Sequence, residues 1–365
     1  MNNHSYWEED SFNFRYDLVV VGAGITGLSS ALFFKREFPG RSVLVLERGA
    51  IPQGASTRNA GFACIGSITE HLADLERTTP QEVRERILRR YRGLELLKQT
   101  VGVESLRYTP CGGYELFTSE EEFQRARDHI PTFNRWLQEL TGQQEVYRAD
   151  TLNGYPVISN RLEGALHPGQ MMRILVHLAR EAGVEIRWNA EVHSVRSSGS
   201  VRLDDGTKFT GTRVLVAANG FAGRLLPEID VVPARGYLFV TRPLKELRWR
   251  GTFHYDRGYI YFRDLGDRLL LGGARNVAEA EEKTDAFGVN ARIRNHLMEF
   301  ANDILELETG WAIDREWSGI MGFTDTKTPV VRGVEGRVYV AAGLSGMGVA
   351  IGMQVAREAV ALLEA

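Results

Sequence analysis

The first clear pattern in the chain is an unbroken apolar run at residues 18–21, which leads into a segment at 27–38 that we interpret as a helix. A run without polar positions is typical of a strand buried on both faces of a parallel sheet. A second apolar run at residues 42–47 ends in Glu47. Together these segments predict a strand, a helix and a second parallel strand.

Two longer amphipathic segments follow, at a point where a continuous doubly wound domain would add its next strands. Residues 80–99 and 119–139 are predicted to be helices, and the second is expected to bend or break at Pro131. Residues 105–119, between them, are predicted to form two short strands around a Gly-Gly turn. The pattern therefore predicts that the first domain is interrupted here and resumes later in the chain.

Regular patterns return in the second half of the chain. Residues 168–183 predict a helix that leads to a strand at 184–195, and residues 200–220 predict a hairpin with an Asp-Gly turn. Residues 253–276 alternate in a way that predicts an antiparallel meander.

The strongest local motif lies between the first strand and the first helix. Gly22, Gly24 and Gly27 form a G-x-G-x-x-G sequence in a strand–helix–strand context. Such glycines permit a tight turn, close approach of a pyrophosphate and close packing of helix on strand, and the helix dipole favours the phosphates. Glu47 at the end of the second strand can accept hydrogen bonds from ribose hydroxyls, and its charge disfavours a 2′-phosphate. We predict a dinucleotide site.

Composition narrows the partners. Hydrophobic residues make up 43% of the chain and charged residues 25%, with a net charge of −3, so the charge gives no general attraction to nucleic acid. The two cysteines, Cys64 and Cys111, form no disulfide framework and lack the spacing of a metal site. No apolar run approaches the roughly 20 residues of a transmembrane helix. We therefore expect a cytoplasmic protein without a metal or a membrane span.

Four segments resemble the FAD-dependent D-amino-acid oxidase superfamily, on its glycine oxidase and sarcosine oxidase side. They are the strand–helix–strand unit, the loop "GASTRNAGF" at 54–62, "VLVAANGFAGRLLP" at 214–227, and "VYVAAGLSGMGVAIGMQVAREAVALL" at 338–363. The resemblance covers about residues 15–364. It implies an FAD-dependent oxidoreductase that transfers hydride from the α-carbon of an amine or amino acid to the flavin.

The resemblance also implies which residues hold FAD. Ser56 and Arg58 are expected near the diphosphate, Asn59 and the backbone of Gly61 near the edge of the ring, and Val192 beside adenine. The loop at 343–348 would place a helix start at the pyrimidine end of the flavin. The complete predicted cofactor set is Gly22, Gly24, Ile25, Thr26, Gly27, Glu47, Arg48, Ser56, Thr57, Arg58, Asn59, Ala60, Gly61, Val192, Ala218, Asn219, Gly220, Gly343, Ser345, Gly346, Met347 and Gly348.

The substrate side is predicted from the same resemblance. Tyr259 or Tyr261 and Arg275 are the candidates for holding a substrate carboxylate. The chain has Met321 and Met347 where similar proteins place arginines, which argues against glycine and sarcosine as substrates.

Two further departures concern the flavin. No lysine stands in the segment 269–273, where sarcosine oxidases have one that promotes reaction with oxygen, so O2 and a quinone both stay open as electron acceptors. No cysteine stands in the segment 321–329, so FAD is predicted to bind non-covalently.

The predicted fold class is α/β, a Rossmann-like FAD-binding domain with an interleaved α+β substrate domain built on an antiparallel sheet. We assign residues 1–78, 148–230 and 318–365 to the FAD-binding domain. Residues 79–147 and 231–317 are assigned to the substrate domain.

Three functions compete at this stage. The first is an FAD-dependent amine or amino-acid oxidoreductase with a small-molecule substrate. The second is a 2-hydroxy-acid or polyol dehydrogenase on the same fold, which would need a base near the flavin. The third is a flavoprotein whose FAD is mainly structural, within a partner complex. His254 and His193 could carry protons, although a lone histidine is more often structural.

Overall fold

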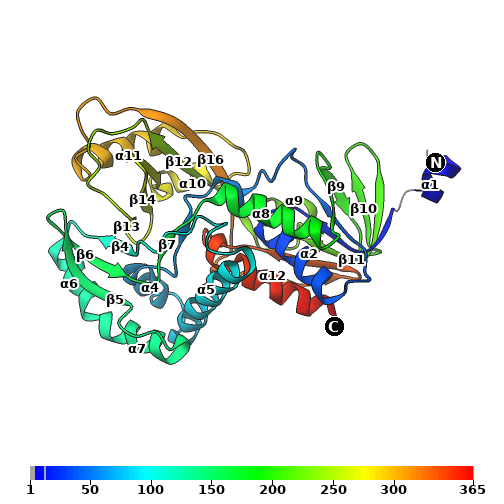
Figure 1. The fold of residues 1–365 in the computed structure, drawn as a ribbon, viewed down its shortest axis with the longest axis horizontal. Helices are drawn as coiled ribbons and strands as arrows, with labels where there is room; N and C mark the ends of the chain where they lie inside the picture. Colours follow the sequence, from blue (N-terminus) through cyan, green and yellow to red (C-terminus); the bar gives the residue numbers. More distant parts are fainter. Residues whose placement is uncertain (1–4, 12–13, 365) are drawn as a thin grey trace.

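The computed structural model describes residues 5–11 and 14–364. The few remaining residues of the predicted FAD-binding domain, 1–4, 12–13 and 365, lie outside the described part. Two large sheets dominate the fold and occupy opposite ends of the molecule in Figure 1. Among the described residues, no helix combines the length and the apolar character that crossing a membrane requires.

The first sheet has a parallel centre, as the buried apolar runs predict. Its strand order is β17-β18-β11-β1-β2-β8, in which β17 is antiparallel and the β9–β10 hairpin extends from β11. The strands are β1 (Arg15–Val21), β2 (Val43–Leu46), β8 (Glu185–Arg187), β9 (Val192–Val195), β10 (Ser200–Leu203), β11 (Lys208–Val216), β17 (Val330–Glu335) and β18 (Val338–Ala342). The carboxyl ends of β1, β2, β11 and β18 therefore meet at one edge.

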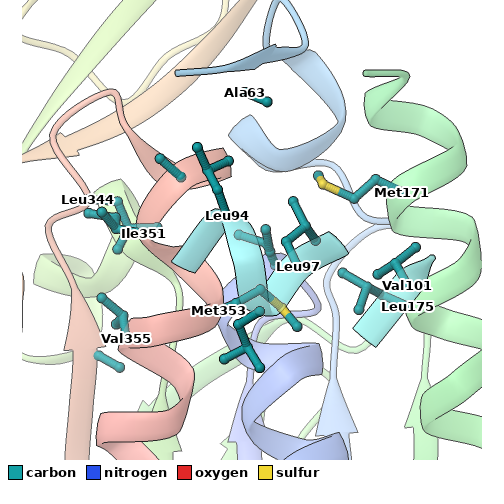
Figure 2. Packing of buried hydrophobic residues seen from close by; sticks show 14 of the residues in the cluster. Ala63, Leu94, Leu97, Val101, Met171, Leu175, Leu344, Ile351, Met353 and Val355 are labelled. Carbon is teal, nitrogen blue, oxygen red and sulfur yellow. The ribbon is translucent and has the colours of Figure 1, made fainter. Parts of the chain in front are cut away.

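The helix α12 (Gly348–Glu364) packs against both α2 (Ile25–Glu37) and α5 (Pro80–Val101) beside this sheet. The helix α8 (Pro168–Glu181) packs on α2 and α5. Figure 2 shows α5 between α8 and α12, with Leu94, Leu97 and Met353 in the shared core. The helices α5 and α12 come close because Gly93 stands at their contact. A Cβ on Gly93 would lie 2.0 Å from the carbonyl oxygen of Ala350 on α12.

The second sheet is largely antiparallel and has the order β16-β12-β15-β14-β13-β4-β6-β5, with one parallel pair, β13 and β4. Its strands are β4 (Gly113–Leu116), β5 (Tyr147–Leu152), β6 (Tyr155–Asn160), β12 (Val232–Thr241), β13 (Thr252–Tyr255), β14 (Ile260–Leu265), β15 (Arg268–Gly273) and β16 (Ile313–Phe323). The predicted meander at 253–276 is confirmed by β13, β14 and β15. Its core includes the stacked rings of Phe253 and Phe262.

The remaining elements are short or lie around the second sheet. A two-stranded ladder joins β3 (Phe62–Ala63) to β7 (Gly164–Ala165). The other helices are α1 (Tyr6–Ser11), α3 (Ala55–Arg58), α4 (Ile68–Leu75), α6 (Glu120–Asp128), α7 (Ile130–Thr141), α9 (Ala222–Leu225), α10 (Glu279–Glu282) and α11 (Ala291–Asp303), with 3₁₀ turns at Asn219–Phe221 and Arg275–Ala278.

The helix predictions are confirmed, including the break before Pro131, which separates α6 from α7. Two strand predictions are partly wrong. In residues 105–119 only β4 forms, because Pro110 lacks an N–H and Thr109 makes a single bridge to Ala165. The predicted strand at 184–195 is interrupted at Asn189, whose φ of +54° turns the chain.

Sheet membership bears on the predicted division into domains. Residues 148–160, assigned from the sequence to the FAD-binding domain, belong to β5 and β6 of the second sheet. The helix α5, assigned to the substrate domain, packs on α12 beside the first sheet. The domain boundaries themselves stay a prediction.

Candidate cofactor and substrate site

A long cavity of about 460 Å³ runs from the carboxyl edge of the first sheet to the second sheet. We call its two parts the first-sheet half and the second-sheet half. The first-sheet half is lined by residues 21–26, 46–48, 54–60, 190–192, 217–225 and 344–350, not every residue of each range taking part. The second-sheet half is lined by residues from 236–238, 254–261, 273–275 and 319–323, and by Met347 from the loop before α12.

The first-sheet half contains the start of α2. A Cβ on Gly27 would lie 1.9 Å from the carbonyl oxygen of Gly22, so the turn between β1 and α2 closes only around a glycine. The N–H of Ile25 donates to the hydroxyl of Ser56 at 3.0 Å. The hydroxyl of Thr26 lines the same place, is buried, and has no partner among the residues that the structure describes. The start of a helix with an unpartnered hydroxyl is suited to an anion.

Glu47 lies at the end of β2 with its carboxylate held in place. One oxygen accepts from the N–H of Ala23 at 2.9 Å and the other from the N–H of Gly49 at 3.1 Å. The side chain is buried yet lines the cavity. Next to it, the guanidinium of Arg48 lies 3.8 Å from the ring centroid of Phe221. A buried carboxylate beside a glycine turn is the arrangement expected for holding the ribose of a dinucleotide.

The loop at residues 54–61 is held by its own hydrogen bonds. The amide of Asn59 donates to the carbonyl oxygens of Ala55 and Ser56, and its oxygen accepts from the N–H of Gly61. The hydroxyl of Thr57 donates to the carbonyl oxygen of Pro52. The loop is therefore a fixed platform under the cavity, and the Asn59 amide is already used within it.

Arg58 is directed to the second sheet. Its guanidinium donates to the carbonyl oxygen of Ser318 at 2.9 Å and lies over the ring of Phe287. The residue still lines the cavity. Its predicted contact with a diphosphate stays a prediction, and the structure gives it a second task of joining the loop to β16.

The carboxy-terminal loop closes the first-sheet half from the other side. The side-chain oxygen of Asn219 accepts from the N–H groups of Gly343 and Leu344 at 3.0 and 3.2 Å. Ser345 follows with φ at +47°, and its N–H donates to the carbonyl oxygen of Gly322. These bonds fix the loop so that the start of α12 lines the cavity.

The second-sheet half brings together the substrate candidates. Tyr259, Tyr261 and Arg275 all line it, and so do Met321 and Met347, which stand where similar proteins have arginines. Burial raises the pKa of Tyr261 to about 12, so its phenol stays protonated. The guanidinium of Arg275 lies 3.7 Å from Glu279 and over the ring of Phe323.

A buried histidine–carboxylate pair lies in the wall of the same half. His254, on β13, contacts Glu163 with 2.9 Å between Nε2 and a carboxylate oxygen. Burial alone would lower the pKa of His254, but the charge and hydrogen bond of Glu163 outweigh burial and raise it. Burial also raises the pKa of the Cys64 thiol nearby, which keeps it protonated. Cys64, Glu163 and His254 are all buried, and each brings one polar atom within 4.8 Å of the others.

Further charged and polar groups surround this pair, and Glu70 among them also lines the cavity. Arg90 pairs with Glu70 at 2.8 Å, and although burial would raise the pKa of Glu70, the charge of Arg90 lowers it to about 2. Burial lowers the pKa of His71 to about 4, and its Nε2 lies 3.1 Å from the hydroxyl of Tyr147. Burial raises the pKa of Glu115, whose oxygen accepts from the hydroxyl of Thr69.

The structure brings most predicted site residues to the cavity. The exceptions are predicted cofactor residues that do not line it and instead shape its turns, namely Gly27, Thr57, Gly61, Gly220 and Gly343. His193 is exposed on β9, where it pairs with Asp204 away from the cavity.

Sequence reasoning missed Phe62, Leu238, Arg257 and Phe323, which also line the cavity. It also missed Glu163, which reaches His254 from a turn after β6. Nothing in the local pattern around Glu163 signals that contact, because its partner is far along the chain on β13.

The residues present fit an extended dinucleotide. The first-sheet half offers a helix start and an unpartnered buried hydroxyl suited to phosphate, and a fixed carboxylate suited to ribose. Because the cavity runs from the first sheet to the second, a bound dinucleotide can extend along it. At the second sheet the cavity is lined by the loop before α12 and by Tyr261 on β14.

Comparison with known proteins agrees with this fit. The family model described as FAD dependent oxidoreductase, DAO, matches residues 17–362. Gamma-glutamylputrescine oxidoreductase of Escherichia coli (strain K12) is 28% identical over 357 residues, which cover 91% of this chain and 80% of that protein. Glycine oxidase of Bacillus licheniformis is 25% identical over 333 residues, covering 87% and 84%. The crystal structure of glycine oxidase from Geobacillus kaustophilus has the same fold, with a TM-score of 0.75 at 22% identity over 96% of this chain and 95% of that one.

Proposed function

Because this chain belongs to the DAO family of FAD dependent oxidoreductases, we propose that it oxidises a secondary amine or an N-substituted amino acid of more than minimal size. The observation that supports this most is the lining of the second-sheet half. Met321 and Met347 lie there beside Tyr261, so the half combines flexible apolar surface with the cations Arg257 and Arg275.

Bound FAD supplies a two-electron acceptor for the hydride of the substrate's α-carbon. In this proposal the start of α2 and Ser56 hold the diphosphate and Glu47 holds the ribose. Asn219 keeps the carboxy-terminal loop in place, so that the start of α12 stabilises negative charge on the reduced cofactor. No cysteine lies in the segment 321–329, and we propose that the cofactor is bound without a covalent link.

The choice of substrate follows from the two methionines. An apolar wall gains about 0.8 kcal/mol for each methylene that it buries, which favours substrates with N-alkyl or side-chain carbon. A small zwitterion needs charge-assisted bonds. The guanidinium of Arg275 lies 4.5 Å from the ring centroid of Phe323, which stands two residues after Met321. Glycine is therefore expected to be a poor substrate.

The names of the relatives support a nitrogen-containing substrate. Gamma-glutamylputrescine oxidoreductase and glycine oxidase are both named for molecules with an amine. The amine must lose its proton before its lone pair can assist departure of the hydride, so the site is expected to favour the neutral amine.

The test is anaerobic mixing of the flavin-loaded protein with a panel of amines, amino acids, N-alkyl amino acids and hydroxy acids, with loss of flavin absorbance as the readout. We expect bulkier N-alkyl amino acids or secondary amines to reduce the flavin faster than glycine or sarcosine. Fastest reduction by glycine would contradict the proposal, and an unbleached flavin across the panel would point to a structural cofactor.

A second candidate is a 2-hydroxy-acid dehydrogenase. Such a reaction needs a base near the flavin to remove the hydroxyl proton, and His254 in the cavity wall provides a group of that kind. The hydroxy acids in the panel separate the two functions, because only one class is expected to bleach the flavin rapidly.

A further inference from the structure

We propose that His254 is the proton acceptor for the substrate's ammonium group and that Glu163 is the residue that positions it. Nε2–H of His254 donates to Glu163, which leaves the Nδ1 lone pair to take the proton. This inference rests on the proposed oxidation of an amine. It adds a base to a reaction that, on the family resemblance, needs none.

The first observation is how firmly Glu163 is held. One carboxylate oxygen contacts His254, and the other accepts from the N–H groups of Ile65 and Gly66 at 3.2 and 3.3 Å and from the amide of Asn160 at 3.1 Å. The side chain of Glu163 is almost completely buried. Three donors on one oxygen hold the carboxylate in one orientation, so the other oxygen stays directed to His254.

The second observation is the tautomer that this contact requires. A carboxylate oxygen accepts hydrogen bonds, so the contact is satisfied when Nε2 of His254 carries a hydrogen and donates it to Glu163. Nδ1 makes no hydrogen bond to any residue in the described ranges, and it is not one of the fully buried atoms without a partner. His254 lines the cavity, and in this proposal Nδ1 is the ring nitrogen offered to the substrate.

The third observation is where the imidazole sits. The edge of the ring meets Phe62 with 5.3 Å between centroids, and His254 pairs across β13 and β14 with Tyr261. Tyr261 and Phe62 line the cavity too. The base is therefore placed beside a residue that we predicted to contact the substrate.

The charges around His254 favour a strong base. Glu163 lies on the turn after β6, Glu115 on β4 opposite His254, and Glu70 on α4, and all three raise the pKa of His254 against the opposing effect of burial. Arg90, the cation of this group, is paired with Glu70. The Cys64 thiol beside the pair stays protonated because burial raises its pKa, so it adds no negative charge.

The step itself is a proton transfer. The N–H bond of the substrate ammonium breaks, its electron pair stays on the substrate nitrogen, and the proton forms a bond with Nδ1. The resulting imidazolium keeps its Nε2–H bond to Glu163, which stabilises the positive charge. The neutral amine that remains is the form from which hydride can leave.

The chain offers a matched control in His193. It also faces a carboxylate, with 3.1 Å between Nδ1 and Asp204, but both side chains are more than half exposed and lie outside the cavity. His193→Gln removes a histidine–carboxylate pair of the same chemistry. It therefore controls for the loss of such a pair while leaving the cavity lining unchanged.

The experiment measures the rate of anaerobic flavin reduction from pH 6 to pH 10 in flavin-loaded wild type, His254→Gln, Glu163→Gln and His193→Gln. The substrate is a secondary amine from the bleaching panel. In wild type we expect the rate to rise with pH through the raised pKa of His254 and then level off. In His254→Gln the rise should move to the pKa of the free amine, with a loss of about 100-fold or more near pH 7 that disappears near pH 10.

Glu163→Gln should shift the profile in the same direction, because a glutamine amide can donate to Nε2 and so force the proton onto Nδ1. His193→Gln should keep the wild-type profile. An unchanged profile in His254→Gln would overturn the proposal. A second outcome would also overturn it. If a carboxylate inhibitor binds more tightly at low pH, and His254→Gln abolishes that effect without changing the rate profile, then His254 is an anion ligand and not a base.

A second measurement does not depend on activity or on the variants' folding. Histidine labelled with 15N gives signals for the eight histidines of the wild-type holoenzyme. We expect one buried ring to carry hydrogen on Nε2, to lack it on Nδ1 at high pH, and to titrate above the usual histidine range. A buried ring of the opposite tautomer, with no ring of the expected kind, would refute the pair. If no amine bleaches the flavin but this ring is found, the proposed function fails and the pair stands.

Discussion

In the first-sheet half of the cavity the lining comes from glycines at the starts of α2 and α12 and from one fixed carboxylate, Glu47, whereas the second-sheet half is lined by large side chains such as Tyr261 and Met321. The first arrangement comes from segments that are continuous in the sequence. The second collects single residues from several strands and from a turn. A site built from backbone has little freedom to change, while one built from side chains can be altered one residue at a time.

The two halves should therefore respond differently to substitution. In the first-sheet half an added methyl group meets backbone that cannot move, so damage is expected to be large and to affect the fold. In the second-sheet half a shortened side chain leaves the sheet intact, so its effects are expected on the substrate alone.

The largest effect is expected for Gly27→Ala. Its new Cβ would lie 1.9 Å from the carbonyl oxygen of Gly22, and β1 or α2 must shift to make room. We expect a loss of about 3 kcal/mol or more in the free energy of unfolding, with loss of bound flavin. Denaturant unfolding and flavin content measure both.

Gly40→Ala is the matched control for that variant, because an added Cβ there meets nothing within 4 Å. It should keep wild-type stability and flavin content. Equal behaviour of the two variants would mean that the turn before α2 is not the rigid element that we describe.

The next effect concerns two buried histidines near the second-sheet half, His71 and His254, whose pKa values are shifted in opposite directions. Burial lowers the pKa of His71 to about 4, whereas Glu163 raises that of His254. Below about pH 6.5, His71 therefore binds a proton in the unfolded chain but not in the folded protein. Stability from this residue is present above pH 6.5 and is lost as the pH falls toward 4, by about 2 to 3 kcal/mol.

His71→Gln tests this contrast, since an amide can still reach the hydroxyl of Tyr147 but does not titrate. The free energy of unfolding between pH 6.5 and 4.5 should fall less steeply in the variant than in wild type. That window lies above the range in which Glu70, with its pKa of about 2 in the folded protein, loses its contribution. Parallel slopes in the two proteins would show that His71 is protonated in the folded state.

A smaller effect is expected for Arg275→Ala. We expect about a tenfold rise in the half-saturating concentration of substrates that carry a carboxylate, and none for simple amines, because only the former would lose a charge-assisted bond. Stopped-flow reduction with paired substrates measures this. An equal rise for both classes would make Arg275 a structural residue through its contacts with Glu279 and Phe323.

The contrast between the halves also decides what could be predicted from the sequence. The strand–helix–strand unit and the positions of Gly22 and Glu47 were predictable, because a buried apolar run and a glycine turn leave local patterns. The family resemblance also predicted that Met321 and Met347 stand at the substrate site, and both line the cavity.

Contacts between distant segments were not predictable in the same way. Glu163 meets His254 only because β6 and β13 both neighbour β4 in the second sheet. Arg58 was expected at the diphosphate from its loop, but its contact with Ser318 depends on where β16 passes. Both contacts are tertiary, and a hydrophobic pattern records which face of an element is buried without recording its partner.

The most direct test of the account compares Glu47→Gln with Arg275→Ala in two assays, the dissociation constant of FAD and the half-saturating concentration of a carboxylate-bearing amine in flavin-loaded protein. We predict that Glu47→Gln weakens FAD about tenfold or more and leaves substrate saturation unchanged, because it loses charge-assisted bonds in the first-sheet half alone. Arg275→Ala should do the reverse. If Glu47→Gln leaves FAD affinity unchanged, or if Arg275→Ala weakens FAD as much as it weakens substrate, the division of the cavity into a cofactor half and a substrate half is contradicted.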